Sequence, residues 1–391
     1  MKRSLFVGAA LFAAVMLPAG ANAQIKIGVI NSYSGQFADT GAQIDNGIKL
    51  YMKQHGDTVA GKKIEIIRKD TGGPNPDVAK RLAQELIVRD KADILAGFTL
   101  TTEALGAASV SEEAKKLMVV MNAATSIVTT MSPYIVRVSL TLPQIADTLA
   151  TWAVKKGGTK KAYTMVSDYG PGIDAEGAFQ KAFKEAGGEI VGSVRMPVAN
   201  PDFSAFVQRA KDLNPESIFV FIPGGAQPAA LGKAFAERGI DPKKVKLLST
   251  GEPVDETAIK SMGDLALDRI SAWHYDFNHK SKMNADFVKA FNAEYKRNPD
   301  FFAVGGYDGM HLIYEALKKT KGNADGDALI AAIKGMKWES PRGVFWIDPE
   351  TRDVVQTVYI RRVQKVGNDI VNVEFDKIEN VKDPVKAAMK K

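Results

Sequence analysis

Two hydroxyl-rich segments are the first candidates for chemistry, because each follows a predicted β-strand. Residues 97–102 (GFTLTT) come after one strand and open a helix, and residues 122–126 (NAATS) come after the next strand. In an open parallel sheet the carboxyl ends of the strands meet the ligand crevice. Hydroxyl groups and backbone N–H groups at a helix N-terminus there favour a small anion, such as a carboxylate. The simpler alternative is that Thr101 and Thr102 only cap the helix, but two such segments on adjacent strand ends favour binding.

Two segments in the second half of the chain also end in side chains that suit a cleft. Residues 167–170 (SDYG) follow a predicted strand and place Tyr169 over its end, and residues 249–253 (STGEP) follow another strand and offer Glu252. An unpaired buried carboxylate is costly, so Glu252 would face a closed cleft only if a cation met it. The role of Glu252 therefore distinguishes two hypotheses, an amino-acid ligand with an ammonium group and a plain acid without one. The alternative is a solvated loop carboxylate.

The motifs of catalysis, cofactor binding and metal binding are incomplete or missing. Residues 56–63 (GDTVAGKK) nearly match a phosphate-binding loop, but they end without its hydroxyl and follow a helix instead of a strand. There is no G-x-S-x-G or H-E-x-x-H motif, and the spacing of His274 and His279 fits no helical metal pair. The absence of cysteine excludes disulfides, thiolate metal sites and a cysteine nucleophile. We therefore expect a protein that is not an enzyme and has no cofactor and no metal.

The first 23 residues have the order of a secretory signal peptide. Lys2 and Arg3 precede an apolar run over residues 5–17, and residues 21–23 (ANA) predict cleavage before Gln24. The run is shorter than the roughly 20 residues of a membrane-spanning helix. No cysteine follows it, so we expect a soluble periplasmic protein without a lipid anchor. The net charge of +7 over 391 residues is mild and does not indicate nucleic-acid binding.

Alternating short β-branched runs and longer helical patterns predict the elements that position these segments. One set ends at residue 121, and a second begins at residue 145 after a pause around residues 133–143. This rhythm predicts an α/β fold of two doubly wound lobes with parallel sheets. The predicted strands are 25–30, 64–69, 94–96, 117–121, 162–167, 190–195, 218–222, 245–248 and 270–273. The predicted helices are 40–53, 76–88, 102–115, 145–155, 175–186, 203–213 and 228–237.

The last quarter of the chain has a different pattern. It is too short for a domain of its own, so we expect it to complete the two lobes through strands that cross a hinge. Gly367 and Asn368 predict a turn between its last two strands. The basic residues 382–391 are expected to form a solvated helix or a frayed tail. Helices are predicted at 285–295, 307–318 and 328–333, and antiparallel strands at 344–347, 354–366 and 370–375.

Together these features resemble the periplasmic substrate-binding proteins of branched-chain amino-acid ABC transporters, the leucine/isoleucine/valine-binding family with the type I periplasmic binding fold. The resemblance runs from about Gln24 to about Asp353. Its motifs are IKIGVINSYSGQFADTGAQIDNGIKL, GKKIEII, GFTLTTEALGAA, NAATS, SDYGPG and VGGYDGMHLIYEAL. It implies two lobes that close over a small-molecule solute and dock on a membrane permease, with a monomer expected. The implied division is 1–23 for the signal peptide, 24–140 plus 276–350 for lobe 1, and 141–275 plus 351–391 for lobe 2.

The resemblance also assigns ligand contacts by position. It implies that Thr101 and Thr102 hold the ligand carboxylate and that Glu252 pairs with an ammonium group. Tyr169 would cover the ligand from lobe 2, and Phe302 would form an aromatic wall of the pocket. The complete predicted ligand-binding set is Phe98, Thr99, Thr101, Thr102, Ala123, Thr125, Tyr169, Glu252 and Phe302.

Two departures from the family pattern weaken a leucine assignment. The first-lobe disulfide of leucine-type members is absent, and residues 224–227 (GGAQ) lack a tyrosine that such members often have. The leading hypothesis is a periplasmic receptor for a small apolar amino acid. One alternative is the same role with an aromatic or other organic acid. An alternative of another class is a secreted sensor or enzyme on the same fold.

Overall fold

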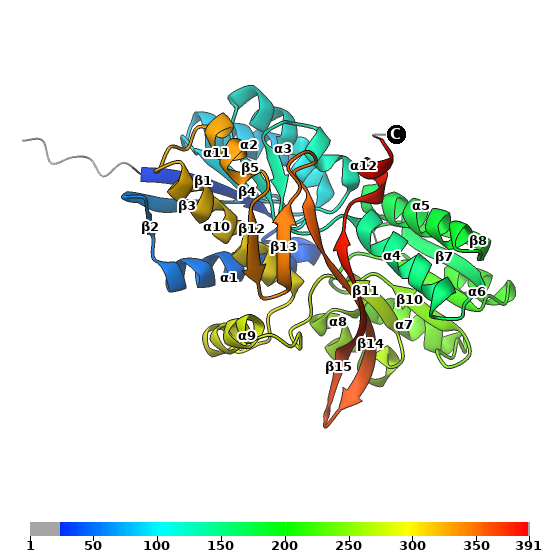
Figure 1. Ribbon diagram of the computed structural model, residues 1–391. Coiled ribbons are helices and arrows are strands. Elements are labelled where there is room, and N and C mark those ends of the chain that lie inside the picture. Colours follow the sequence, from blue (N-terminus) through cyan, green and yellow to red (C-terminus); the bar gives the residue numbers. More distant parts are fainter. Residues whose placement is uncertain (1–23, 200, 390–391) are drawn as a thin grey trace, which may run out of the picture.

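The computed structural model describes residues 24–199 and 201–389, which form two α/β lobes side by side (Figure 1). The predicted signal peptide, residues 1–23, lies outside the described residues. We call the part built on the first sheet lobe 1 and the part built on the second sheet lobe 2. Among the described residues, no helix is long and apolar enough to cross a bilayer.

Lobe 1 is built on a six-stranded sheet in which β1 lies between β3 and β4, and all pairs except the β2–β3 hairpin are parallel. The spatial order is β2 (Thr58–Val59), β3 (Lys62–Asp70), β1 (Gln24–Asn31), β4 (Ile94–Gly97), β5 (Met118–Val120) and β6 (Ile135–Arg137). Its helices are α1 (Ala38–His55), α2 (Pro76–Val88), α3 (Thr101–Ala114), α9 (Lys282–Tyr295), α10 (Phe301–Lys319) and α11 (Gly326–Ile333).

Strand β1 shows why this sheet needs helices on both faces. Ile27 and Val29 belong to the same core cluster as the buried residues of α1 and α10, whereas Ile30 belongs to the cluster of α2 and α3. All three side chains are fully buried. Because successive strand residues point to opposite faces, a continuous apolar run requires cover on each side.

Lobe 2 is built on a nine-stranded sheet whose inner strands are parallel, while the strands at the lobe junction are antiparallel. The order is β12 (Lys337–Ser340), β13 (Gly343–Ile347), β14 (Val354–Val366), β11 (Ile270–Trp273), β10 (Lys246–Ser249), β9 (Ser217–Phe221), β7 (Lys161–Ser167) and β8 (Glu189–Met196), with β15 (Asp369–Val381) paired to β14. Its helices are α4 (Leu142–Lys155), α5 (Gly170–Glu185), α6 (Phe203–Asp212), α7 (Gln227–Glu237), α8 (Glu256–Met262) and α12 (Pro384–Ala388).

The lobes are joined by chain segments that run between the two sheets. The chain leaves lobe 1 after β6, returns to it between β11 and α9, and leaves again between α11 and β12. Strands β14 and β15 form the predicted antiparallel hairpin, with Val366 opposite Asp369 around the predicted turn. The predicted fold class, two doubly wound lobes with a multi-strand hinge, is confirmed. The exact division of the chain between the lobes stays a prediction.

The structure corrects several element predictions. The predicted pause around residues 133–143 contains the strand β6, and the strands β2 and β12 were not predicted. Strand β15 continues to Val381, beyond the predicted end at residue 375. The basic C-terminal segment forms α12, but it is not solvated throughout, because Lys386 is only 5% exposed. A local sequence pattern missed this burial because the partners of Lys386 lie at distant positions in the chain.

Candidate functional site

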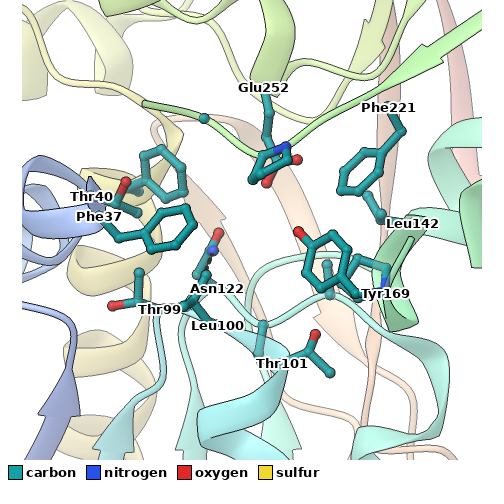
Figure 2. Close-up of a pocket in the computed structure, with 16 residues that line it drawn as sticks. Phe37, Thr40, Thr99, Leu100, Thr101, Asn122, Leu142, Tyr169, Phe221 and Glu252 are labelled. Atoms are coloured by element: carbon teal, nitrogen blue, oxygen red, sulfur yellow. Dashed lines mark hydrogen bonds between the residues drawn. The ribbon is translucent and has the colours of Figure 1, made fainter. Parts of the chain in front are cut away.

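A pocket of about 390 Å³, partly open to solvent, lies between the lobes where strands from both sheets end (Figure 2). The wall is mostly apolar with a few polar groups. The lining residues are Phe37, Thr40, Thr99, Leu100, Thr101, Asn122, Ala123, Ala124, Leu142, Tyr169, Pro171, Phe221, Pro223, Gly224, Glu252 and Phe302.

On lobe 1, the turn after β4 and the loop after β5 form one hydrogen-bonded rim. The Thr99 hydroxyl donates to Asn31 Oδ1 at 3.1 Å, and Asn122 Nδ2 donates to the Thr99 carbonyl at 2.7 Å. The hydroxyl groups of Thr101 and Thr125 lie 2.9 Å apart and share a hydrogen bond. These side chains are buried, so the rim has a fixed shape.

Two helix N-termini from opposite lobes meet at this rim. Helix α3 begins at Thr101 and helix α5 begins at Gly170, and a Cβ atom at position 170 would lie 3.2 Å from Thr125 Oγ1. The first N–H groups of a helix have no partner inside the helix and carry partial positive charge. The hydroxyl of Thr102, also in the first turn of α3, is buried and has no partner among the described residues. This arrangement can bind a carboxylate.

On lobe 2, Glu252 reaches the pocket from the side opposite Thr101, and Tyr169 enters it beside Thr101 (Figure 2). Glu252 is 9% exposed, and within the described part of the chain its Oε2 atom has no hydrogen-bond partner. Burial, and next the nearby Asp255 carboxylate, raise the pKa of Glu252 to about 8. Burial and then the Glu252 charge raise the pKa of the Tyr169 hydroxyl well above its usual value.

Aromatic rings form much of the apolar wall. Phe221 is 1% exposed, and its ring stacks on that of Tyr169 with centroids 6.1 Å apart and an angle of 25° between the planes. Phe37 and Phe302 are each 4% exposed and come from lobe 1. Flat rings on several sides of a narrow pocket suit an apolar, planar group.

The structure brings most of the predicted site residues together. Three predicted residues lie outside the lining: Thr125 bonds to Thr101, Thr102 has an unpartnered hydroxyl, and Phe98 is fully buried in the lobe 1 core. The backbone of Phe98 has a φ of 69°, which turns the chain sharply between β4 and α3. Six predicted residues line the pocket, namely Thr99, Thr101, Ala123, Tyr169, Glu252 and Phe302.

The sequence predictions missed the contributions of two other strand ends. Phe37 and Thr40 follow β1, and Phe221, Pro223 and Gly224 lie at the end of β9 and just after it. The rule that ligands bind at the carboxyl ends of parallel strands also applies to these two segments, because β1 and β9 are parallel strands of the lobe 1 and lobe 2 sheets. Only the segment after β9 lacks polar side chains, whereas residues 32–40 (SYSGQFADT) after β1 are rich in them, so the rule applied to β1 would have found Thr40.

Other candidate sites from the sequence have structural roles. Residues 56–63 contain the β2–β3 turn. His274 is buried beside Trp273, and His279 Nδ1 lies 3.0 Å from a Glu374 carboxylate oxygen. Within residues 24–199 and 201–389, there is no cluster of three or more histidine or acidic residues that could hold a metal ion.

Comparison with known proteins gives the family of this fold and site. A sequence model of the periplasmic binding protein family matches residues 24–368. A curated Brucella melitensis protein, Leu/Ile/Val-binding protein homolog 6, is 39% identical over 388 residues, covering 98% of this chain and 99% of the relative.

Two solved structures are similar over nearly their whole length. A solute-binding protein of an ABC transporter from Rhodopseudomonas palustris BisB5, in complex with 3,4-dihydroxybenzoic acid, is 54% identical with a TM-score of 0.89, covering 93% of this chain and 99% of that chain. One from Rhodopseudomonas palustris HaA2, in complex with p-hydroxybenzoic acid, is 42% identical with a TM-score of 0.90, covering 93% and 100%. The predicted family is thereby confirmed, and this chain belongs to the periplasmic binding protein family.

Proposed function

We propose that the chain is the solute-binding component of an ABC importer and that it binds a small aromatic carboxylic acid between its lobes. Binding and release complete this role, so the proposal includes no catalysis, no cofactor and no metal. The family supports a periplasmic location. Export through a cleaved signal peptide, a monomeric state and docking on a membrane permease are further parts of the proposal.

The carboxylate end of the solute would lie at the two helix N-termini. Thr101 supplies a hydroxyl, and Thr102 has a buried hydroxyl without a described partner. The N-terminus of α5 approaches from lobe 2, as the short distance from position 170 to Thr125 indicates. Hydrogen bonds to a charged group contribute about 1.5–3 kcal/mol each. A few of them and a buried ring reach about −8.2 kcal/mol, the free energy of a micromolar dissociation constant.

The observation that carries the aromatic assignment is the buried, unpartnered Glu252 carboxyl group in a pocket walled by rings. Because its pKa is raised to about 8, this group is mostly protonated at neutral pH. A protonated carboxyl group can donate to and accept from a neutral phenolic hydroxyl. An ammonium group would require ionised Glu252, which costs about 1.4 kcal/mol at one pH unit below the pKa. The two Rhodopseudomonas palustris relatives, whose complexes contain hydroxybenzoic acids, support the same solute class.

The second candidate solute is a small apolar amino acid, which was the leading hypothesis from the sequence. Glu252 favours it because an ammonium group would also satisfy the unpartnered Oε2 atom. The name of the Brucella melitensis relative, a Leu/Ile/Val-binding protein homolog, points in the same direction. The two candidates share the carboxylate site and differ only at Glu252 and the rings.

A thermal-shift panel tests the proposed function. The panel contains 4-hydroxybenzoate, 3,4-dihydroxybenzoate, benzoate, leucine and phenylalanine, with buffer alone as the reference. A solute at 100 times its dissociation constant adds about 2.7 kcal/mol of stability, or several degrees of Tm at roughly 2–4 °C per kcal/mol. We expect shifts with the hydroxybenzoates and none with leucine. A shift with leucine alone would reverse the assignment, and no shift with any compound would refute solute binding of this kind.

Substitution of Glu252 then separates the two solute classes. Glu252→Gln keeps a donor and an acceptor at the site but cannot become negatively charged. We expect hydroxybenzoate affinity to change by less than about threefold, whereas an ammonium-bearing solute would lose binding by about tenfold or more. Glu237→Gln, at an exposed position on α7, is the matched control. Titration calorimetry with each variant gives the affinities.

A further inference from the structure

The C-terminal helix α12 is anchored in a buried polar network. The Lys386 ammonium group contacts the Asp353 carboxylate and the Thr129 hydroxyl. Asp383 caps the helix by accepting from the Val385 N–H at 2.9 Å. Asp353 is 1% exposed, so neither member of the Lys386–Asp353 pair is solvated. Removing one partner of such a buried pair is strongly destabilising, so the contact constrains where α12 can lie.

The same network continues to the wall of the pocket. Asp353 Oδ1 accepts from Arg137 Nε at 2.8 Å, and Arg137 is fully buried. Arg137 Nη1 in turn donates to the carbonyl groups of Ala123 and Thr125, each at 2.8 Å. Ala123 lines the pocket and Thr125 bonds to Thr101. The pocket loop is therefore connected to α12 through Arg137 and Asp353.

Ser126 connects this loop directly to α12 and to the opposite lobe. Its hydroxyl donates to Asp383 Oδ2 at 2.5 Å, and its backbone N–H donates to Asp174 Oδ2 at 2.7 Å. Asp174 lies on the first turns of α5, the lobe 2 helix whose N-terminus faces the pocket. Helix α12 itself packs against α4 of lobe 2 (Figure 1). Ser126 of lobe 1 thus donates to the carboxylates of Asp174 in α5 and of Asp383 at the start of α12, which both belong to lobe 2.

We propose that α12 is a positioning element for lobe closure, which holds the loop around Ala123–Ser126 and couples it to α5 through Ser126. It would then set solute affinity although none of its residues lines the pocket. The proposal rests on the proposed function in one respect, that a solute in this pocket draws the lobes together. It assigns Ser126, Asp383 and Lys386 as positioning residues that act through the loop and do not touch the solute.

A double-mutant cycle in the solute-binding assay tests the coupling. Ser126→Ala removes the hydroxyl, and Asp383→Asn keeps an oxygen to cap α12 but removes its charge. Because both remove the same charge-assisted hydrogen bond, we expect each to weaken 4-hydroxybenzoate binding by about tenfold. The double variant should be no weaker than either single variant. The loss should appear as faster dissociation with an unchanged association rate, since closure holds a solute that is already bound. Wild-type dissociation rates in both variants would overturn the proposal.

Hydrogen exchange in the solute-free protein tests the same proposal without any solute. We expect Lys386→Met to speed amide exchange in residues 123–130 by about tenfold or more. Lys382→Met is the matched control, because Lys382 pairs with Asp348 but its side chain is 58% exposed. If Lys386→Met does not fold, Asp383→Asn takes its place in this measurement. Unchanged exchange would overturn the role of α12. If the wild-type protein binds no acid at all, the proposed function fails, and the exchange result alone decides the role of α12.

Discussion

The two rims of the pocket differ in how completely their polar side chains are bonded. On lobe 1, Thr99, Thr101, Asn122 and Thr125 all have hydrogen-bond partners. These internal bonds hold the shape of the rim without a solute, and the buried Thr102 hydroxyl in the first turn of α3 is left without a partner among the described residues. Lobe 1 therefore presents a preformed surface to an incoming solute.

Lobe 2 shows the opposite condition. Ser249 at the end of β10, and Thr250 and Glu252 just after it, each have a buried side-chain oxygen without a partner among the described residues, and of the three only Glu252 lines the pocket. An unsatisfied buried polar group costs about 1–3 kcal/mol. The comparison indicates that the lobe 1 rim is largely organised before a solute binds, whereas Glu252 of lobe 2 can gain a partner when a solute or water occupies the pocket.

The largest expected effect comes from breaking the bonding of the lobe 1 rim. Arg137→Met removes the donor to the Ala123 and Thr125 carbonyl groups and leaves the buried Asp353–Lys386 pair incomplete. Loss of one partner of a buried ion pair costs about 3–5 kcal/mol, so the free energy of unfolding in urea should fall by that amount. Arg297→Met, which breaks a partly exposed pair with Asp39, is the control and should cost below about 1 kcal/mol. Equal losses in both variants would show that the lobe 1 rim is not specially stabilised.

A smaller effect is expected when the rim keeps its shape but loses one ligand donor. Thr101→Ala removes a hydroxyl that we propose bonds the solute carboxylate, a contact of about 1.5–3 kcal/mol. Calorimetry should show 4-hydroxybenzoate binding weakened by about tenfold or more, and Thr101→Ser should restore most of it. The control is Thr130→Ala, because Thr130 is exposed. Wild-type affinity of Thr101→Ala would mean that the carboxylate binds elsewhere.

The smallest effect concerns the unsatisfied lobe 2 rim and its dependence on pH. The pKa of Glu252 is raised from 4.5 to about 8 in the folded protein. The folded state therefore holds a proton between pH 4.5 and 8 that the unfolded state releases. The contribution of protonated Glu252 to the free energy of unfolding is complete below pH 4.5 and is lost as the pH rises to 8. Relative to the wild type, Glu252→Gln should gain about 1 kcal/mol in unfolding free energy between pH 6.5 and 7.5. A constant difference across that range would mean that Glu252 is ionised throughout.

The sequence predicted the fold well because its signals are local. Apolar β-branched runs alternate with helical patterns, and each pattern corresponds to an element that buries its own face. The rule about strand ends then located most polar groups of the pocket. It worked for residues such as Thr101 and Glu252 because their short segments carry polar side chains directly after a strand.

The remaining features depend on contacts between residues far apart in the chain. Arg137 and Asp353 are 216 positions apart, and no local spacing shows that they form a buried pair. Lys386 was assigned to a solvated segment because basic termini usually are solvated. Its burial follows from Asp353 and Thr129, which only the folded chain brings to it.

The lack of a side chain at Gly170 bears on delivery as well as on binding. A Cβ atom there would lie 3.2 Å from Thr125 Oγ1 and 3.8 Å from Thr101 Cγ2, so an alanine at this position would push the two rims apart by a few tenths of an ångström. A larger residue would keep the two lobes slightly further apart, and the solute would then dissociate faster. A solute-binding protein that supplies a transporter must keep its solute bound while it diffuses and release the solute at the permease. We therefore expect the absence of a methyl group at position 170 to lengthen the residence time of the solute.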